Sequence, residues 1–254
     1  MVLIKEFRIV MPLSLEEVAQ MYMVMKMQQQ NTSSTEGVDV LENRNFEDGL
    51  FGKGRYTSKV YRLQRLLLGL VVLRQPMLSR CKRKLGTHTR DAKQCPYFTS
   101  FTLTIETIHR ADNGHSENVH GLNKQQLADR EVEIIDIAST SDDYWSYVIG
   151  SNTVDFSKFQ SSRTARGPLL EGWQDHCKPV MTAYKLVTVD APYWGFGSRL
   201  EQALIAGERA LFLESHRNCF AWIDEWHGMT VKMMCDIEKQ SIPLSHEESL
   251  SSPF

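Results

Sequence analysis

The amino-acid sequence predicts an α+β fold in which an antiparallel sheet wraps around one long helix. Two observations carry this prediction. Alternating apolar and polar residues, the pattern of half-buried strands, recur in segments separated by turn-forming residues up to Asp190. Beyond that point, residues 198–226 repeat apolar side chains at helical spacing. Strands joined by turns, with one long helix late in the chain, are typical of the α+β class.

Six segments are expected to form strands, and two further segments are expected to form helices. The strands are residues 5–13, 37–46, 54–64, 97–110, 130–139 and 179–192. The turn ADNG follows the fourth of them. An early helix at residues 14–30 is opened by a capping box of Ser14 and Glu17, and a last helix is expected at residues 229–240.

Composition excludes several classes of protein. With 254 residues, 42% hydrophobic and 24% charged, the chain has ordinary globular composition, and its net charge of −2 argues against a dedicated nucleic-acid binder. The longest apolar run, residues 66–73, is far shorter than the about 20 residues that a membrane-spanning helix needs. The five cysteines lack metal-ligand spacing and are interpreted as reduced thiols of a cytoplasmic protein, so no metal site is expected.

Several polar residues share a strand face with apolar ones. Lys185 has the same parity as Val187, and Thr107 continues the apolar parity of its own strand. Thr57 and Lys59 likewise share one face of the third strand. A buried, unpaired ammonium costs several kcal/mol, so these groups either have a buried anionic partner or line a cavity that holds an anionic ligand. Taken singly, each could instead be a lysine that reaches solvent or a threonine bonded to the backbone.

Long sequence blocks resemble the single-domain phosphatidylinositol transfer proteins, and most closely their plant-type members. These blocks include VLIKEFRIVMPLSLEE, GKGRYTSKVYRLQ, IETIHRADNG, REVEIIDIA, MTAYKLVTVDAPYWGFGSRLEQ and HRNCFAWIDEWHGMT. The resemblance implies a StART-like fold, in which a curved antiparallel sheet and long helices enclose one phospholipid. It also implies exchange of phosphatidylinositol or phosphatidylcholine between membranes with no chemical reaction and no cofactor. The expected domain is residues 1–240, followed by a disordered tail at 241–254.

The same resemblance implies roles for individual residues of this chain. The positions expected to contact the inositol headgroup are Thr57, Lys59 and Glu238. The positions expected around the lipid phosphate are Gln20, Thr107 and Lys185. Tyr193 and Trp194 match an exposed aromatic pair that enters the membrane during docking, and Ser161 and Thr164 match positions of a regulatory loop. Glu238 could instead lie on a solvated helix face, and Tyr193 and Trp194 could instead fold back into the core.

The chain departs from the family pattern at three places. Residues 65–94 match no family block, and their eight Lys and Arg against a single Asp indicate either a lineage-specific insert or a shifted reading frame. The early helix is two residues shorter than in the family, so the assignment of Gln20 depends on where the gap is placed. Ala165 stands where the family has glycine, which costs roughly 1 kcal/mol if that position needs a positive φ.

Two other functions compete with transfer. A lipid-modifying enzyme is disfavoured because the sequence lacks a G-x-S-x-G motif, and its histidines, including His109 and His216, show no metal or triad spacing and are interpreted as structural or exposed. A phospholipid-binding sensor without net transfer would use the same residues as a carrier. The expected partners are a phospholipid and, transiently, a membrane surface; the chain is expected to be a monomer.

Overall fold

The computed structural model of the chain describes residues 2–17, 19, 22–23, 26, 38–48, 52–61, 83–86, 102–139 and 153–241. For 38–48, 52–61, 83–86, 102, 235 and 238–241 it describes the backbone alone. Within these described parts of the chain, no helix is both long and apolar enough to cross a membrane. Apart from Ser241, which ends the last helix, the expected tail lies outside the described residues.

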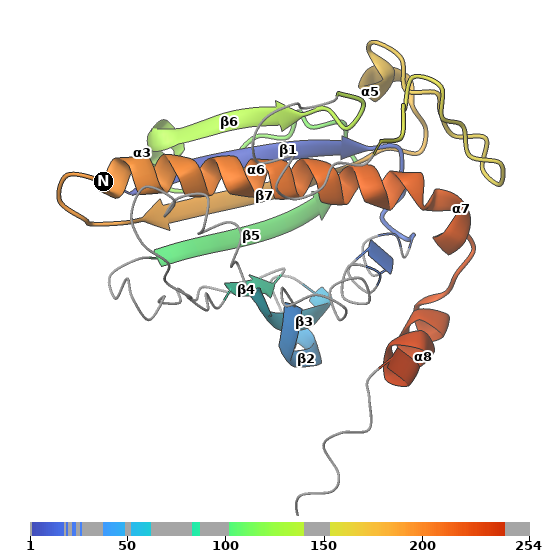
Figure 1. Cartoon of the computed structure of the whole chain (residues 1–254), viewed down its shortest axis with the longest axis horizontal. Helices are drawn as coiled ribbons and strands as arrows, with labels where there is room; N and C mark the ends of the chain where they lie inside the picture. Colours follow the sequence, from blue (N-terminus) through green and yellow to red (C-terminus); the bar gives the residue numbers. More distant parts are fainter. Residues whose placement is uncertain are drawn as a thin grey trace, which may run out of the picture.

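The described strands form one seven-stranded sheet in the order β2-β3-β4-β5-β7-β1-β6 (Figure 1). Their bounds are β1 Leu3–Met11, β2 Val38–Asp48, β3 Gly52–Tyr61, β4 Arg83–Gly86, β5 Thr102–Arg110, β6 Arg130–Ile135 and β7 Met181–Asp190. The six strands expected from the alternation are present, with ends that differ by up to five residues. β4 lies inside residues 65–94, the segment expected to be atypical, and pairs with both β3 and β5.

The prediction of a wholly antiparallel sheet is wrong for two pairs of strands. β1 pairs with β6, and β4 with β5, in parallel. The first case has a clear cause, because β7 and β1 lie between β5 and β6 in the sheet. The chain therefore cannot turn back at ADNG. Residues 111–129, which include the helix α3 (Lys124–Asp129), form a crossover of the length that a parallel arrangement needs.

The long helix of the prediction is confirmed, although it is interrupted near its end. α6 (Gly197–Ala221) is followed at Trp222 by the four-residue helix α7 (Ile223–Trp226), and α8 (Val231–Ser241) follows. Residues 19, 22, 23 and 26 are helical, as expected for the early helix. The Glu17 side chain accepts a hydrogen bond of 2.8 Å from the Ser14 backbone N–H, one half of the predicted capping box. The short helices α3 and α5 (Trp173–His176) were not predicted.

The core lies between α6 and one face of the sheet, along which the helix runs (Figure 1). Alternation sends Phe7 and Ile9 of β1 and Val187 of β7 to this face, and all three are fully buried. The Phe7 ring meets Phe212 of α6 edge to face, with 5.6 Å between the ring centroids. These apolar contacts hold α6 against β1 and β7.

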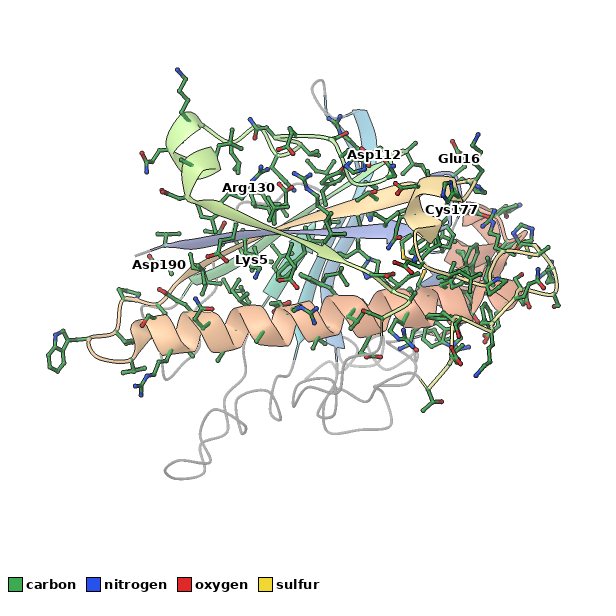
Figure 2. The ribbon with its side chains drawn as sticks, turned by 90° about the horizontal axis from the view of Figure 1, so that it is seen from above. Lys5, Glu16, Asp112, Arg130, Cys177 and Asp190 are labelled. Carbon is green, nitrogen blue, oxygen red and sulfur yellow. The ribbon has the colours of Figure 1, made fainter. Side chains whose placement is uncertain are left out.

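The opposite face of the sheet carries a buried network of charges. Glu6 is fully buried, and its two carboxylate oxygens accept hydrogen bonds of 2.8 Å from Arg8 Nε and Arg130. Glu117 from the crossover accepts from both arginines as well. Figure 2 labels Arg130 and Asp112 on this side of the sheet, away from α6. The charges of Glu6 and Arg8, in the middle of β1, are thus satisfied by the crossover segment and β6.

Candidate functional site

A buried lysine and a buried threonine meet between the sheet and α6. Lys185 of β7 and Thr107 of β5 are register partners and are 6% and 7% exposed. The Lys185 ammonium donates to Thr107 Oγ1 over 3.3 Å and lies 4.9 Å from the centroid of the Phe212 ring. The prediction that parity turns these two polar side chains towards the interior is therefore confirmed.

Two histidines lie beside this pair, and the sequence pattern alone did not include them in the site. His109 continues the inward parity of Thr107 along β5, and the fully buried His216 comes from α6. Burial lowers the pKa of His109 to about 4 and that of His216 to about 3, and the charge of Lys185 contributes to both shifts. The interpretation of His216 as structural or exposed missed this cluster, although the parity of His109 was visible in the sequence.

The side chains expected at the inositol headgroup lie outside the described part of the chain. Thr57 and Lys59 belong to β3, whose backbone pairs with β2 and β4. Their spacing of two residues places them on the same face of that strand. Glu238 lies in α8, where only its backbone is described. Gln20, expected near the phosphate, is not among the described residues. Their roles stay predictions.

The two residues of the aromatic pair between β7 and α6 have different surroundings. Trp194 is 98% exposed, whereas the half-buried Tyr193 ring stacks on Phe196 with 5.1 Å between centroids and packs against the core. A Cβ at position 197 would clash with the Ala191 carbonyl oxygen, so glycine is required where the loop enters α6. The loop lies at one end of the molecule (Figure 1). Phe196, which is 45% exposed, was not singled out from the sequence.

The loop that contains Ser161 and Thr164 is fastened to α7 through one carboxylate. Asp224 accepts hydrogen bonds from Ser161 Oγ at 2.5 Å, from Ser162 Oγ at 2.8 Å and from the backbone N–H of Ser162 and Arg163. The hydrogen bond from Ser161 is the largest cause of the lowered pKa of Asp224. Thr164 donates through its hydroxyl to Ser161 Oγ at 2.8 Å. The buried Ser161 is thus the centre of the loop's hydrogen bonds.

The neighbouring acid of α7 holds a different segment. Glu225 accepts a hydrogen bond of 2.5 Å from the Tyr22 hydroxyl and forms an ion pair with Lys26, whose ammonium also lies over the Trp222 ring. Burial is the largest cause of the raised pKa of Tyr22. α7 therefore joins the early helical residues, on one side, to the loop around Ser161 on the other.

Ala165 has the left-handed backbone conformation, with φ of 56°. We expect Ala165→Gly to stabilise the fold by about 1 kcal/mol, because glycine has no Cβ to strain in this conformation. Urea denaturation of both proteins would measure the difference. The matched change Ala203→Gly, inside α6, should instead destabilise by about 0.5–1 kcal/mol. A destabilising effect at position 165 would contradict the strain argument.

The described residues contain no group of three His, Cys, Asp or Glu side chains placed to hold a metal ion. Their arrangement instead combines a buried lysine–threonine pair with a tryptophan held out in water. The first feature suits an anionic group held inside the protein, and the second suits contact with an apolar surface. Together they fit a ligand-binding protein that docks on such a surface.

The chain belongs to the phosphatidylinositol transfer protein family, whose model matches residues 2–242. It is 34% identical over 253 residues to cytoplasmic phosphatidylinositol transfer protein 1 of Drosophila melanogaster, covering 98% of this chain and 92% of the relative. It is 37% identical over 238 residues to phosphatidylinositol transfer protein 1 of Dictyostelium discoideum, covering 90% and 89%. The cytoplasmic phosphatidylinositol transfer protein 1 of Mus musculus is 34% identical over 242 residues, covering 93% and 72%.

Proposed function

We propose that the chain binds one molecule of phosphatidylinositol or phosphatidylcholine in an internal cavity and carries it between membranes without chemical change. The observation that carries this proposal is the buried pair of Lys185 and Thr107, which supplies a cation and a hydroxyl between the sheet and α6. A phosphodiester has a negative charge and acceptor oxygens that such a pair can bind. The family is described as one of transfer proteins, which agrees with the expectation that the chain is not an enzyme.

The energetics of a phospholipid in water favour an enclosed ligand. Two acyl chains contain about 30 methylenes, and exposing them at about 0.8 kcal/mol each costs more than 20 kcal/mol. A hydrogen bond to the headgroup contributes only about 1 kcal/mol. The acyl chains would therefore determine whether the cavity is filled, and the headgroup contacts would determine which phospholipid fills it. This division of roles agrees with a StART-like cavity formed by a single domain at residues 1–240.

The remaining expected residues have parts in this proposal. Thr57, Lys59 and Glu238 would select inositol, Gln20 would join Lys185 and Thr107 at the phosphate, and Tyr193 and Trp194 would enter the membrane. The loop at Ser161 and Thr164 would regulate access through its attachment to α7. The protein would be a cytoplasmic monomer that contacts membranes transiently. The names of two relatives describe those proteins as cytoplasmic.

Native mass spectrometry of the recombinant chain tests the binding step, with one copurified phospholipid per chain as the expected result. Transfer of labelled lipid between vesicles tests the carrier step. Lys59→Ala should lower phosphatidylinositol transfer about fivefold relative to phosphatidylcholine, since one headgroup hydrogen bond is worth about 1 kcal/mol. Ser58→Ala, on the other face of β3, is the matched control and should leave the ratio unchanged.

Three results would count against parts of the proposal. Equal loss of both lipids in Lys59→Ala would remove this residue from headgroup selection. A chain that binds phospholipid but moves none between vesicles would be a sensor. A chain that copurifies without phospholipid and takes up none from vesicles would not be a carrier.

A further inference from the structure

The cluster around Lys185 contains two histidine side chains in addition to the lysine ammonium. His109 on β5 and His216 on α6 both respond to the charge of Lys185, and His216 also responds to His109, so the three groups lie close together. Phe212 connects two of them directly. Its ring lies under the Lys185 ammonium, and its carbonyl oxygen is 2.7 Å from His216 Nδ1.

Each histidine has one buried ring nitrogen that makes no hydrogen bond within the described part of the chain. The Nε2 atoms of His109 and His216 are buried and have no hydrogen-bond partner among the described residues. The tautomer of His216 follows from its other nitrogen. A carbonyl oxygen can only accept, so Nδ1 must donate its proton to Phe212, and neutral His216 therefore has a lone pair on Nε2. A buried polar atom without a partner needs an explanation, and a bound ligand is one.

We propose that His109 and His216 are part of the anion site of Lys185 and Thr107, and that binding a phosphodiester brings a proton onto this histidine pair. The inference rests on the proposed function, because the phosphodiester is that of the carried phospholipid. Neutral His216 would turn a lone pair towards an anion, and only the protonated ring can donate from Nε2. Burial is the main reason that both rings are neutral, and the charge of Lys185 adds to it. A bound phosphate would oppose the charge of Lys185 and would itself attract a proton onto the rings.

The elements around the cluster carry other charged groups. Some of them form ion pairs or bind backbone atoms, and the acids lie on α6 together with His216. Lys5 of β1 and Arg209 of α6 both pair with Glu133 of β6, over 2.8 and 2.5 Å. Arg217 of α6 donates to backbone carbonyls. The buried acids of α6 are Glu201, Glu208 and Glu214. Glu201 accepts from the Ala191 backbone N–H at the far end of the helix.

The proposal predicts that phospholipid binding strengthens as pH falls. A group whose pKa is higher in the complex than in the empty protein takes up a proton on binding, so affinity rises below the pKa of the complex. The rise is at most tenfold per pH unit for each proton. The empty-site pKa values of His109 and His216, about 4 and 3, lie below the range from pH 7.5 to pH 5.5, so both rings of the empty protein stay neutral there. A ring whose pKa rises into this range on binding makes the complex tighter at pH 5.5 than at pH 7.5.

The test measures uptake of fluorescent phosphatidylcholine from vesicles at pH 7.5 and pH 5.5 by the wild-type chain and by His109→Gln and His216→Gln. His120→Gln, at a histidine beside Glu106 outside the cluster, is the matched control. We expect the wild type and the control to bind severalfold more tightly at pH 5.5, and the cluster variants to lose part of this gain. NMR titration of the histidine rings, which needs no variant, should show higher pKa values with phospholipid bound than without.

Different outcomes separate the inference from the function on which it rests. A wild-type chain that retains phospholipid equally at both pH values, with no shift in the histidine titration, would overturn the inference and leave transfer intact. A chain that takes up no phospholipid at either pH would overturn both. If inorganic phosphate alone produced the full histidine shift, the site would recognise free phosphate, and the assignment to a lipid headgroup would fail.

Discussion

Replacing Arg217 with methionine should destabilise the protein by about 3–5 kcal/mol. Arg217 is 1% exposed, and its guanidinium donates to the carbonyl oxygens of Ile137 at 2.5 Å, Ser139 at 2.9 Å and Val154 at 2.8 Å. It also lies 4.6 Å from the centroid of the Phe156 ring. Methionine keeps much of the volume but leaves buried carbonyl groups without donors, each at a cost of about 1–3 kcal/mol.

Equilibrium unfolding in urea would measure this loss. Arg209→Met is the matched control, because Arg209 is a third exposed and its ion pair with Glu133 should be worth less than about 1 kcal/mol. The argument fails if the two variants unfold at the same urea concentration. It would also fail if Arg217→Met lost less than about 1 kcal/mol, because the three carbonyls would then have found other donors.

Replacing Trp194 with alanine should slow phospholipid transfer about tenfold or more while leaving the fold and the bound lipid unchanged. The indole is 98% exposed, so its removal takes nothing from the core. Burying a large apolar side chain is worth about 1.5–3 kcal/mol, and this gain would be lost at the membrane interface, where tryptophan is favoured. Each 1.4 kcal/mol is a tenfold change in association.

The measurements are the vesicle transfer rate, co-sedimentation with vesicles and the amount of lipid retained in solution. Leu170→Ala removes another exposed apolar side chain from a different loop and should leave transfer near the wild-type rate. Tyr193→Ala is less informative, because this ring stacks on Phe196 and packs against the core, so a double variant would mix docking with stability. Loss of bound lipid in Trp194→Ala would show that the indole serves the cavity.

Strand alternation predicted the faces of the sheet but not the order of its strands. The period of two residues places Lys185 and Thr107 on the side of α6, and the structure confirms this. Alternation says nothing about which strand is a neighbour, so it could not show that the chain crosses over from β5 to β6. Adjacent strands are fixed by tertiary packing, which no local pattern records.

The candidate site was predictable in its strands and much less so in its helices. His109 has the same parity as Thr107 and could have been included. His216 could not, because α6 is buried on nearly all sides and periodicity then fails to separate inward from outward positions. The role of Asp224 was equally hidden, since its partners at Ser161 to Arg163 are some sixty residues away along the chain.

The short helix α7 has a mechanical consequence. Asp224 and Glu225 are consecutive, so their side chains leave the helix axis about 100° apart and reach segments from distant parts of the sequence. A rotation or translation of this single turn would pull on both attachments at once. The loop near Ser161 and the helical residues around Tyr22 are thus coupled through α7. Neither segment can move away from α7 unless Asp224 or Glu225 loses its hydrogen-bond donors.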